Sequence, residues 1–195
     1  MKAFLKSGFL FSLLGLFIIA CKKDDSSGSL KPVIGTSAFT VTQADTFMHI
    51  EMNLFTNKRD TILLDINNDS KNDFRITLYG ANIGLMQSYT RTADIIFQCI
   101  NTEDSVLTYE HFPVIVNQGA SLDTMVYWQN TQYIYMIHQW QDWTTGNISY
   151  QGTWNNISEK YIGLKIEKKY AWVKLSTITS NTYFNVTVHE YGIEK

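Results

Sequence analysis

Every second residue is apolar in five segments of this chain, and mostly polar residues lie between. A strand turns successive side chains to opposite faces of its sheet, so this period of two places one face on a core. Aromatic and β-branched residues are abundant, whereas Leu- and Ala-rich helical repeats are absent. The alternating segments are residues 48–54, 74–78, 162–166, 171–175 and 184–188.

Extending this pattern along the chain gives about ten or eleven strands at the spacing of a sandwich or barrel. We predict an all-β fold, an antiparallel β-sandwich, because nothing indicates the regularity of a closed barrel. No internal repeat and no domain boundary interrupts residues 32–195, so they are predicted to form one domain. Residues 80–92 are predicted as a long loop or a short helix.

The N-terminus has the features of a secretory signal. Lys2 and Lys6 precede an apolar stretch over residues 9–20, which is shorter than the about 20 residues that a membrane-spanning helix needs. The ending Ile-Ile-Ala-Cys at 18–21 resembles a bacterial lipobox. The resemblance implies that residues 1–20 are a lipoprotein signal peptide and that Cys21 is acylated, for example with palmitate. The alternative is an ordinary cleaved signal followed by a chance cysteine.

Residues 22–25 read Lys-Lys-Asp-Asp and are followed by a Ser/Gly-rich stretch. This step resembles the export signal of surface lipoproteins in Bacteroidota-type bacteria. The resemblance implies a lipid-anchored protein of the outer membrane at the cell surface, with the periplasmic face as the alternative. In either case residues 21–31 are predicted to be the lipidated Cys21 and a flexible tether.

Charge and motif content narrow the function classes. The chain has 16 basic and 18 acidic side chains, and two of the lysines precede Cys21, so the mature domain is weakly acidic. Without a basic patch we predict no nucleic-acid partner. No histidine-based metal motif, Gly-x-Ser-x-Gly elbow or P-loop occurs, so we predict a protein that is not an enzyme. Cys99 lies in an apolar run and is predicted to be a buried, inert thiol.

One constellation has the chemistry of cation coordination. Oxygen-bearing side chains alternate at Asp65, Asn67, Asp69 and Asp73. Ca²⁺ takes six to eight oxygen ligands, and a tight loop of alternating Asx residues can turn several oxygens inward. The carbonyl of Lys71 corresponds to the backbone ligand at position 7 of an EF-hand loop. These five residues are therefore predicted to hold a structural Ca²⁺ ion.

The match to an EF-hand is partial. Ser70 stands where the loop needs glycine, and Ile76 stands where it needs a bidentate glutamate. Because both flanks are predicted to be strands, the segment instead resembles the strand–loop–strand calcium loops of FG-GAP-type repeats. The resemblance implies an ion that cross-links two strands. The alternative is an Asx-rich turn without a metal, and Mg²⁺ is less suited because it demands strict octahedral geometry.

Aromatic residues gather in the last third of the chain. Exposed rings on a β surface can stack on sugar rings, and Trp140 and Trp143 are the candidate ligand-binding residues because they flank Gln141 and Asp142. The alternative is that these rings fill the interior of the sandwich. The set comprises Tyr127, Trp128, Tyr133, Tyr135, Trp140, Trp143, Tyr150, Trp154 and Tyr161.

The C-terminal segments, residues 161–166, 170–175 and 186–193, resemble the end of many uncharacterised secreted β proteins of the same bacterial group. That resemblance implies no catalytic residues. We therefore expect a lipid-anchored binding or interaction module of the cell envelope, attached to the membrane through Cys21, whose partner is a glycan or an envelope protein. The alternatives are a purely structural accessory lipoprotein that docks a partner protein and, less favoured, a glycan-active hydrolase.

Overall fold

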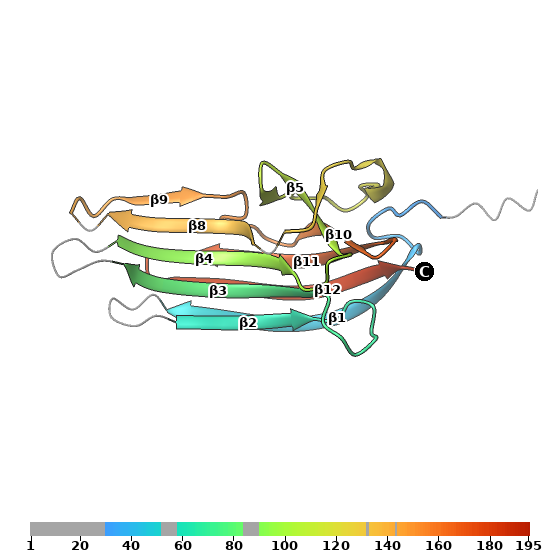
Figure 1. The fold of residues 1–195 in the computed structure, drawn as a ribbon, viewed down its shortest axis with the longest axis horizontal. Helices are drawn as coiled ribbons and strands as arrows, with labels where there is room; N and C mark the ends of the chain where they lie inside the picture. Colours follow the sequence, from blue (N-terminus) through green and yellow to red (C-terminus); the bar gives the residue numbers. More distant parts are fainter. Residues whose placement is uncertain (1–29, 52–57, 84–89, 132, 143) are drawn as a thin grey trace, which may run out of the picture.

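The computed structural model describes residues 30–51, 58–83, 90–131, 133–142 and 144–195. Two antiparallel β-sheets pack face to face, which confirms the predicted all-β sandwich (Figure 1). The predicted signal peptide, Cys21, most of the tether and Trp143 lie outside the described residues. Among the described residues, no helix is long and apolar enough to cross a membrane.

The described residues form twelve strands, slightly more than expected, and one short 3₁₀ helix, η1 (Leu122–Thr124). The seven-stranded sheet has the order β1-β12-β11-β10-β5-β6, with β7 also paired to β5. Its strands are β1 (Phe39–Glu51), β5 (Ser105–Tyr109), β6 (Phe112–Pro113), β7 (Trp128–Gln129), β10 (Lys160–Ile166), β11 (Lys169–Thr179) and β12 (Tyr183–Glu194).

The five-stranded sheet has the order β2-β3-β4-β8-β9. Consecutive strands pair as hairpins, except that β4 is followed by the excursion through β5, β6 and β7 before the chain returns in β8 (Figure 1). Its strands are β2 (Lys58–Leu64), β3 (Phe74–Ile83), β4 (Thr90–Cys99), β8 (Ile134–Asp142) and β9 (Ile148–Gln151).

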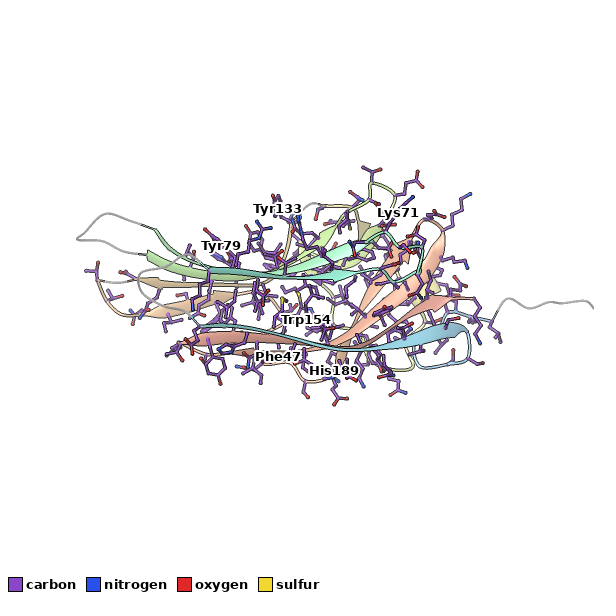
Figure 2. All side chains as sticks on the ribbon, turned by 90° about the horizontal axis from the view of Figure 1, so that it is seen from below. Phe47, Lys71, Tyr79, Tyr133, Trp154 and His189 are labelled. Atoms are coloured by element: carbon purple, nitrogen blue, oxygen red, sulfur yellow. The ribbon has the colours of Figure 1, made fainter. Side chains whose placement is uncertain are left out.

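The main core lies between the two sheets and is filled by the alternating apolar positions. Phe74, Ile76 and Leu78 of β3 are fully buried there, as the period of two predicts. Trp154, in the connection between β9 and β10, lies between the sheets (Figure 2). Its indole Nε1 donates a hydrogen bond to the Pro113 carbonyl at 3.0 Å, which satisfies its one polar atom.

The prediction of a loop or helix over residues 80–92 is wrong for both of its ends. β3 continues to Ile83 and β4 begins at Thr90, with residues paired in register from Gly80–Ala93 to Ile83–Thr90. Gly80 and Ala81 have low intrinsic preference for strands, but ladder hydrogen bonds to a neighbouring strand override that preference. The middle of that segment, residues 84–89, lies outside the described residues.

A second, smaller core covers the outer face of the seven-stranded sheet. Trp172 is its centre, in edge contact with Phe39 and Tyr161 at ring-centroid distances of 6.0 and 5.2 Å. Leu122 of η1 and Ile34 close it from outside. The alternation on β11 predicts that Trp172 faces away from the main core; the structure adds that the segments around residues 34–39 and 114–125 bury it there.

Candidate functional site

The predicted calcium loop, residues 65–73, joins β2 to β3 and closes on its own backbone. The Asp65 carboxylate accepts N–H hydrogen bonds from Asp69 at 3.1 Å and from Ser70 at 2.9 Å. Asn67 Oδ1 accepts a second bond from the Asp69 N–H at 3.0 Å, and Asp69 Oδ1 accepts from the Lys71 N–H at 2.8 Å. These are the local side-chain-to-backbone bonds that Asx residues make in turns, and they hold the loop in a fixed shape.

Asp73, the last predicted ligand, is almost completely buried. Its Oδ2 accepts N–H hydrogen bonds from Ile66 at 2.8 Å and Asn67 at 3.3 Å. Burial raises the pKa of Asp73 above its ordinary value; the two hydrogen bonds oppose that shift, and repulsion from Asp104 and Asp65 adds to it. A negative charge at this position is therefore costly without a compensating cation.

A polar cavity of about 460 Å³ opens beside this loop. Four of the five predicted calcium ligands line it, namely Asn67, Asp69, Lys71 and Asp73, whereas Asp65 does not. The other wall is formed by the turn after β4 and by the tip of the β10–β11 hairpin. That wall contributes Ile100, Asn101, Thr102, Glu103, Asp104, Ile166 and Glu167.

Asp104 and Glu167 are among the cavity residues that sequence spacing missed. Asp104 is as deeply buried as Asp73 and accepts hydrogen bonds from Asn101 Nδ2 at 3.0 Å and from the Glu167 N–H at 3.3 Å. Burial raises the pKa of Asp104, and repulsion from Glu167 and Glu103 adds to the shift. These residues lie far from Asp65 in the chain, so no local motif could have joined them to the loop.

The residues around the cavity offer the oxygen donors that Ca²⁺ prefers, but their side chains are not arranged around one common point. Five carboxylates face one lysine, and hard oxygens are the donors that Ca²⁺ prefers. Within the described ranges, however, no three acidic, histidine or cysteine side chains are placed to hold a metal ion. The carboxylates of Asp69, Asp73 and Asp104 accept backbone N–H bonds, although a carboxylate offers about four acceptor positions. Ion binding would thus require these side chains to turn toward one another.

A second candidate site lies on the outer face of the five-stranded sheet, along β8. Tyr133, Tyr135, His138 and Trp140 form a row of rings that we call the β8 ring ladder. His138 contacts Tyr135 edge-on at a centroid distance of 5.8 Å and stacks on Trp140 at 5.3 Å with an interplanar angle of 27°. Figure 2 shows Tyr133 and Tyr79 on this face, opposite Phe47 and His189 on the outside of the other sheet.

A β-bulge brings these rings to one face. Ile95 pairs with Ile137, but the next residue, Ile96, pairs with Tyr135, so Met136 is an extra residue on β8. Regular alternation would place Tyr135 and His138 on opposite faces, because they are three positions apart. The extra residue restores them to the same face. Met136 itself is fully buried in the main core.

His138 is held by a buried acid on the neighbouring strand. Its Nδ1 lies 2.5 Å from Oδ1 of Asp94, which is 8% exposed. Burial raises the pKa of Asp94, and the hydrogen bond and charge interaction with His138 oppose that shift. A carboxylate on Nδ1 fixes the orientation of the imidazole, so Nε2 is the ring nitrogen that a ligand can use.

More polar groups lie under the same face. Thr77 of β3 is buried, and its Oγ1 makes no hydrogen bond within the described residues. Arg75 Nε donates to Gln98 Oε1 at 2.8 Å across β3 and β4. Gln151 of β9 is paired with His138 and is exposed. The face therefore combines aromatic rings with hydrogen-bonding groups of both kinds.

Some of the aromatic residues between Tyr127 and Tyr161 fill the cores, and others lie exposed where a ligand could contact them. Trp154 and Tyr161 are buried in the two cores, whereas Tyr133 and Tyr135 are exposed on the ladder. Trp140, a candidate ligand-binding residue, is half-buried on that face, while Trp143 lies outside the described residues. His138 and Asp94 were missed: period-two alternation puts His138 on the face of Trp140, but only the pairing of β4 with β8 brings Asp94 beside them.

Two groups with catalytic chemistry have ordinary structural surroundings. Ser176 Oγ lies 2.8 Å from His189 Nε2, but it also accepts the Glu159 N–H at 2.9 Å, and the Glu159 carboxylate pairs with Lys174 rather than with the imidazole. Cys99 is buried and unpaired, as predicted, and burial raises its pKa to about 12. A thiol with that pKa is not a nucleophile near neutral pH.

Comparisons with protein-family models, with curated proteins and with solved structures each found no match.

Proposed function

We propose that this protein is a lipid-anchored module of the cell envelope that binds a ligand through the outer face of its five-stranded sheet and performs no reaction. The lipobox-like ending at Cys21 and the polar residues that follow it support the anchor and the tether. The observation that carries the binding role is the β8 ring ladder, supported on the buried Asp94.

Neither part of this arrangement is explained by stability alone. Tyr133 is 61% and Tyr135 is 40% exposed, although large aromatic residues stabilise a fold most when buried. Asp94 carries an acidic group into a nearly buried position, where its pairing with His138 only opposes the unfavourable desolvation. Exposed aromatics beside restrained polar groups are typical of recognition surfaces. A ligand-binding role explains why they occur together.

A photo-crosslinking pair in intact cells tests this role. A photoreactive residue at Gln151, beside His138 on the ladder face, is compared with one at Ile178, which is 48% exposed on β11 in the other sheet. We expect adducts with an envelope component from position 151 and few from position 178. Equal yields from both positions, or none from position 151, would contradict the proposal.

The same adducts distinguish the accessory-protein alternative, in which position 151 would crosslink to a protein. The hydrolase alternative has one observation in its favour, the cavity lined by Asp73 and Asp104, since glycosidases use two carboxyl groups and raise the pKa of the acid. Both side chains are 1% exposed and accept hydrogen bonds from the protein itself. They are therefore better placed for a structural role.

We also propose that the cavity beside residues 65–73 takes up a structural Ca²⁺ ion. The spacing of the Asx residues and the shared cavity support this proposal. So does the mutual repulsion of Asp73 and Asp104, which a divalent cation would relieve. Such an ion would link the β2–β3 connection to the turn after β4.

Millimolar Ca²⁺ is expected to raise the melting temperature of the wild-type protein, and Asp69→Ala is expected to abolish that rise. A ligand at 100 times its Kd stabilises by about 2.7 kcal/mol, which corresponds to roughly 5–10 °C for a chain of this size. The rise should shrink as pH falls, because protons compete for the same carboxylates. Differential scanning fluorimetry with EDTA and Ca²⁺ measures it.

Asp60→Ala, an exposed acid on the edge strand β2, serves as the matched control and should retain the full Ca²⁺ effect. If Ca²⁺ did not change the melting temperature of the wild-type protein, the proposed calcium site would be refuted. The ladder proposal would be unaffected by that result.

A further inference from the structure

We infer that the ligand of the β8 ring ladder is an extended, uncharged polysaccharide chain. This inference rests on the proposed binding role of the face and adds the chemical class of its ligand. Three properties of the face carry it: the linear arrangement of the rings, the mixture of apolar and hydrogen-bonding groups, and the scarcity of charge.

The rings follow one strand rather than surrounding a pocket. Tyr133 directly precedes β8, Tyr135, His138 and Trp140 succeed one another along it, and the ring contacts between the last three are continuous. At ~3.3 Å per residue the row is roughly 20 Å long. A straight row of this length matches a linear polymer, which can contact every ring at once, better than it matches a compact small molecule.

A sugar unit presents C–H groups on the flat faces of its ring and hydroxyl groups around its rim. An aromatic ring with an exposed face packs against the first, and amide, imidazole and carboxylate groups pair with the second. On this face Trp140 lies next to His138, whose Nε2 is the nitrogen left for a ligand, and Gln151 lies across from His138 on β9. An aromatic ring for the C–H face of a sugar and polar groups for its hydroxyls thus lie within one strand spacing of each other on this face.

The small number of charged side chains on this face disfavours a strongly ionic ligand. Strand register places Arg59, Arg75, Asp94 and Asp142 on it as the charged side chains among the described residues. Asp94 is paired with His138, and Arg75 is bonded to Gln98. An anionic polysaccharide or an acidic lipid surface would call for several lysines or arginines close together. An uncharged polymer needs neither positively nor negatively charged side chains on the face that binds it.

Affinity electrophoresis of the full-length lipoprotein in a non-ionic detergent tests this inference. Native gels contain a soluble β-1,3-glucan, a β-1,4-xylan or an α-mannan as neutral probes, and dextran sulfate as the anionic one. We expect at least one neutral polysaccharide to retard the wild-type protein. Tyr133→Ala and Trp140→Ala should each weaken that retardation at least tenfold, and His138→Gln should weaken it less.

Tyr127→Ala is the matched control, because Tyr127 is 62% exposed but pairs with Tyr109 away from the ladder; its retardation should equal that of the wild type. Tyr133 is exposed enough that its removal leaves the fold intact, so that variant remains informative if Trp140→Ala is destabilised. Retardation only by dextran sulfate, by no neutral probe, or equally in Tyr133→Ala and wild type would overturn the inference. If position 151 then crosslinked to an envelope protein, the binding role would stand and the carbohydrate ligand alone would fall.

Discussion

Replacing Trp154 by alanine is expected to lower the free energy of unfolding by about 3–5 kcal/mol, as large-to-small changes of core aromatics do. The side chain is completely buried between the two sheets. Its indole N–H donates to the Pro113 carbonyl, which the variant would leave without that donor. The Trp154 backbone N–H donates to the Met136 carbonyl of β8 at 3.3 Å and its carbonyl accepts a hydrogen bond from Thr177 of β11, so the residue connects both sheets. Urea denaturation followed by circular dichroism measures the loss.

Trp154→Phe separates the two contributions. Phenylalanine fills much of the space but cannot donate to Pro113, so it should recover more than half of the stability lost in Trp154→Ala. Exposed Tyr150→Phe, in the preceding strand β9, should change the free energy of unfolding by less than about 0.5 kcal/mol. A Trp154→Ala protein as stable as wild type would mean that the indole is not packed between the sheets.

Replacing Cys21 by alanine is expected to release the protein from the membrane almost completely. Each buried methylene of an acyl chain contributes about 0.8 kcal/mol, and several chains on one residue give stable attachment where a single chain does not. Without the thiol there is no acylation site at the position where the lipobox-like motif places it. Incorporation of labelled palmitate and membrane fractionation measure the effect.

Cys99→Ala is the control for this experiment, because Cys99 is the chain's other cysteine and is buried in the fold. That variant should keep the palmitate label and remain in the membrane fraction. If Cys21→Ala protein still incorporated palmitate, or if wild type incorporated none, the lipid anchor would be refuted.

Period-two alternation was sufficient to predict the central strands. It located the buried residues of β10, β11 and β12, such as Leu164, Val173 and Val186, because those strands each turn one face to the main core. It gave no indication that the opposite face is buried in places. Trp172 and Gly192 show this: they pair on the outer face, and a Cβ at Gly192 would come within 2.6 Å of the indole. Which loops cover that face depends on tertiary contacts that no local pattern encodes.

The candidate sites show the same division between local and long-range information. The residues at 65–73 were found because they are close in sequence, and four of the five predicted ligands line one cavity. Asp104 and Glu167 join them only through folding. At the β8 ring ladder Trp140 was identified by its aromatic character, but the bulge at Met136 brings Tyr135 onto the same face and the pairing with β4 brings Asp94 there. A one-residue shift in register exchanges the faces of a strand, so those companions were beyond sequence reasoning.

Hydroxyl-radical footprinting of the full-length lipoprotein tests the binding face most directly, because the radicals oxidise exposed aromatic side chains. The protein is labelled in intact envelopes and again after extraction into detergent. We expect Tyr133, Tyr135 and Trp140 to be protected in the envelope and to become reactive on extraction, while exposed Phe47 on the opposite sheet reacts equally in both states. Equal reactivity of the ladder residues in the two states, or protection confined to Phe47, would contradict the account.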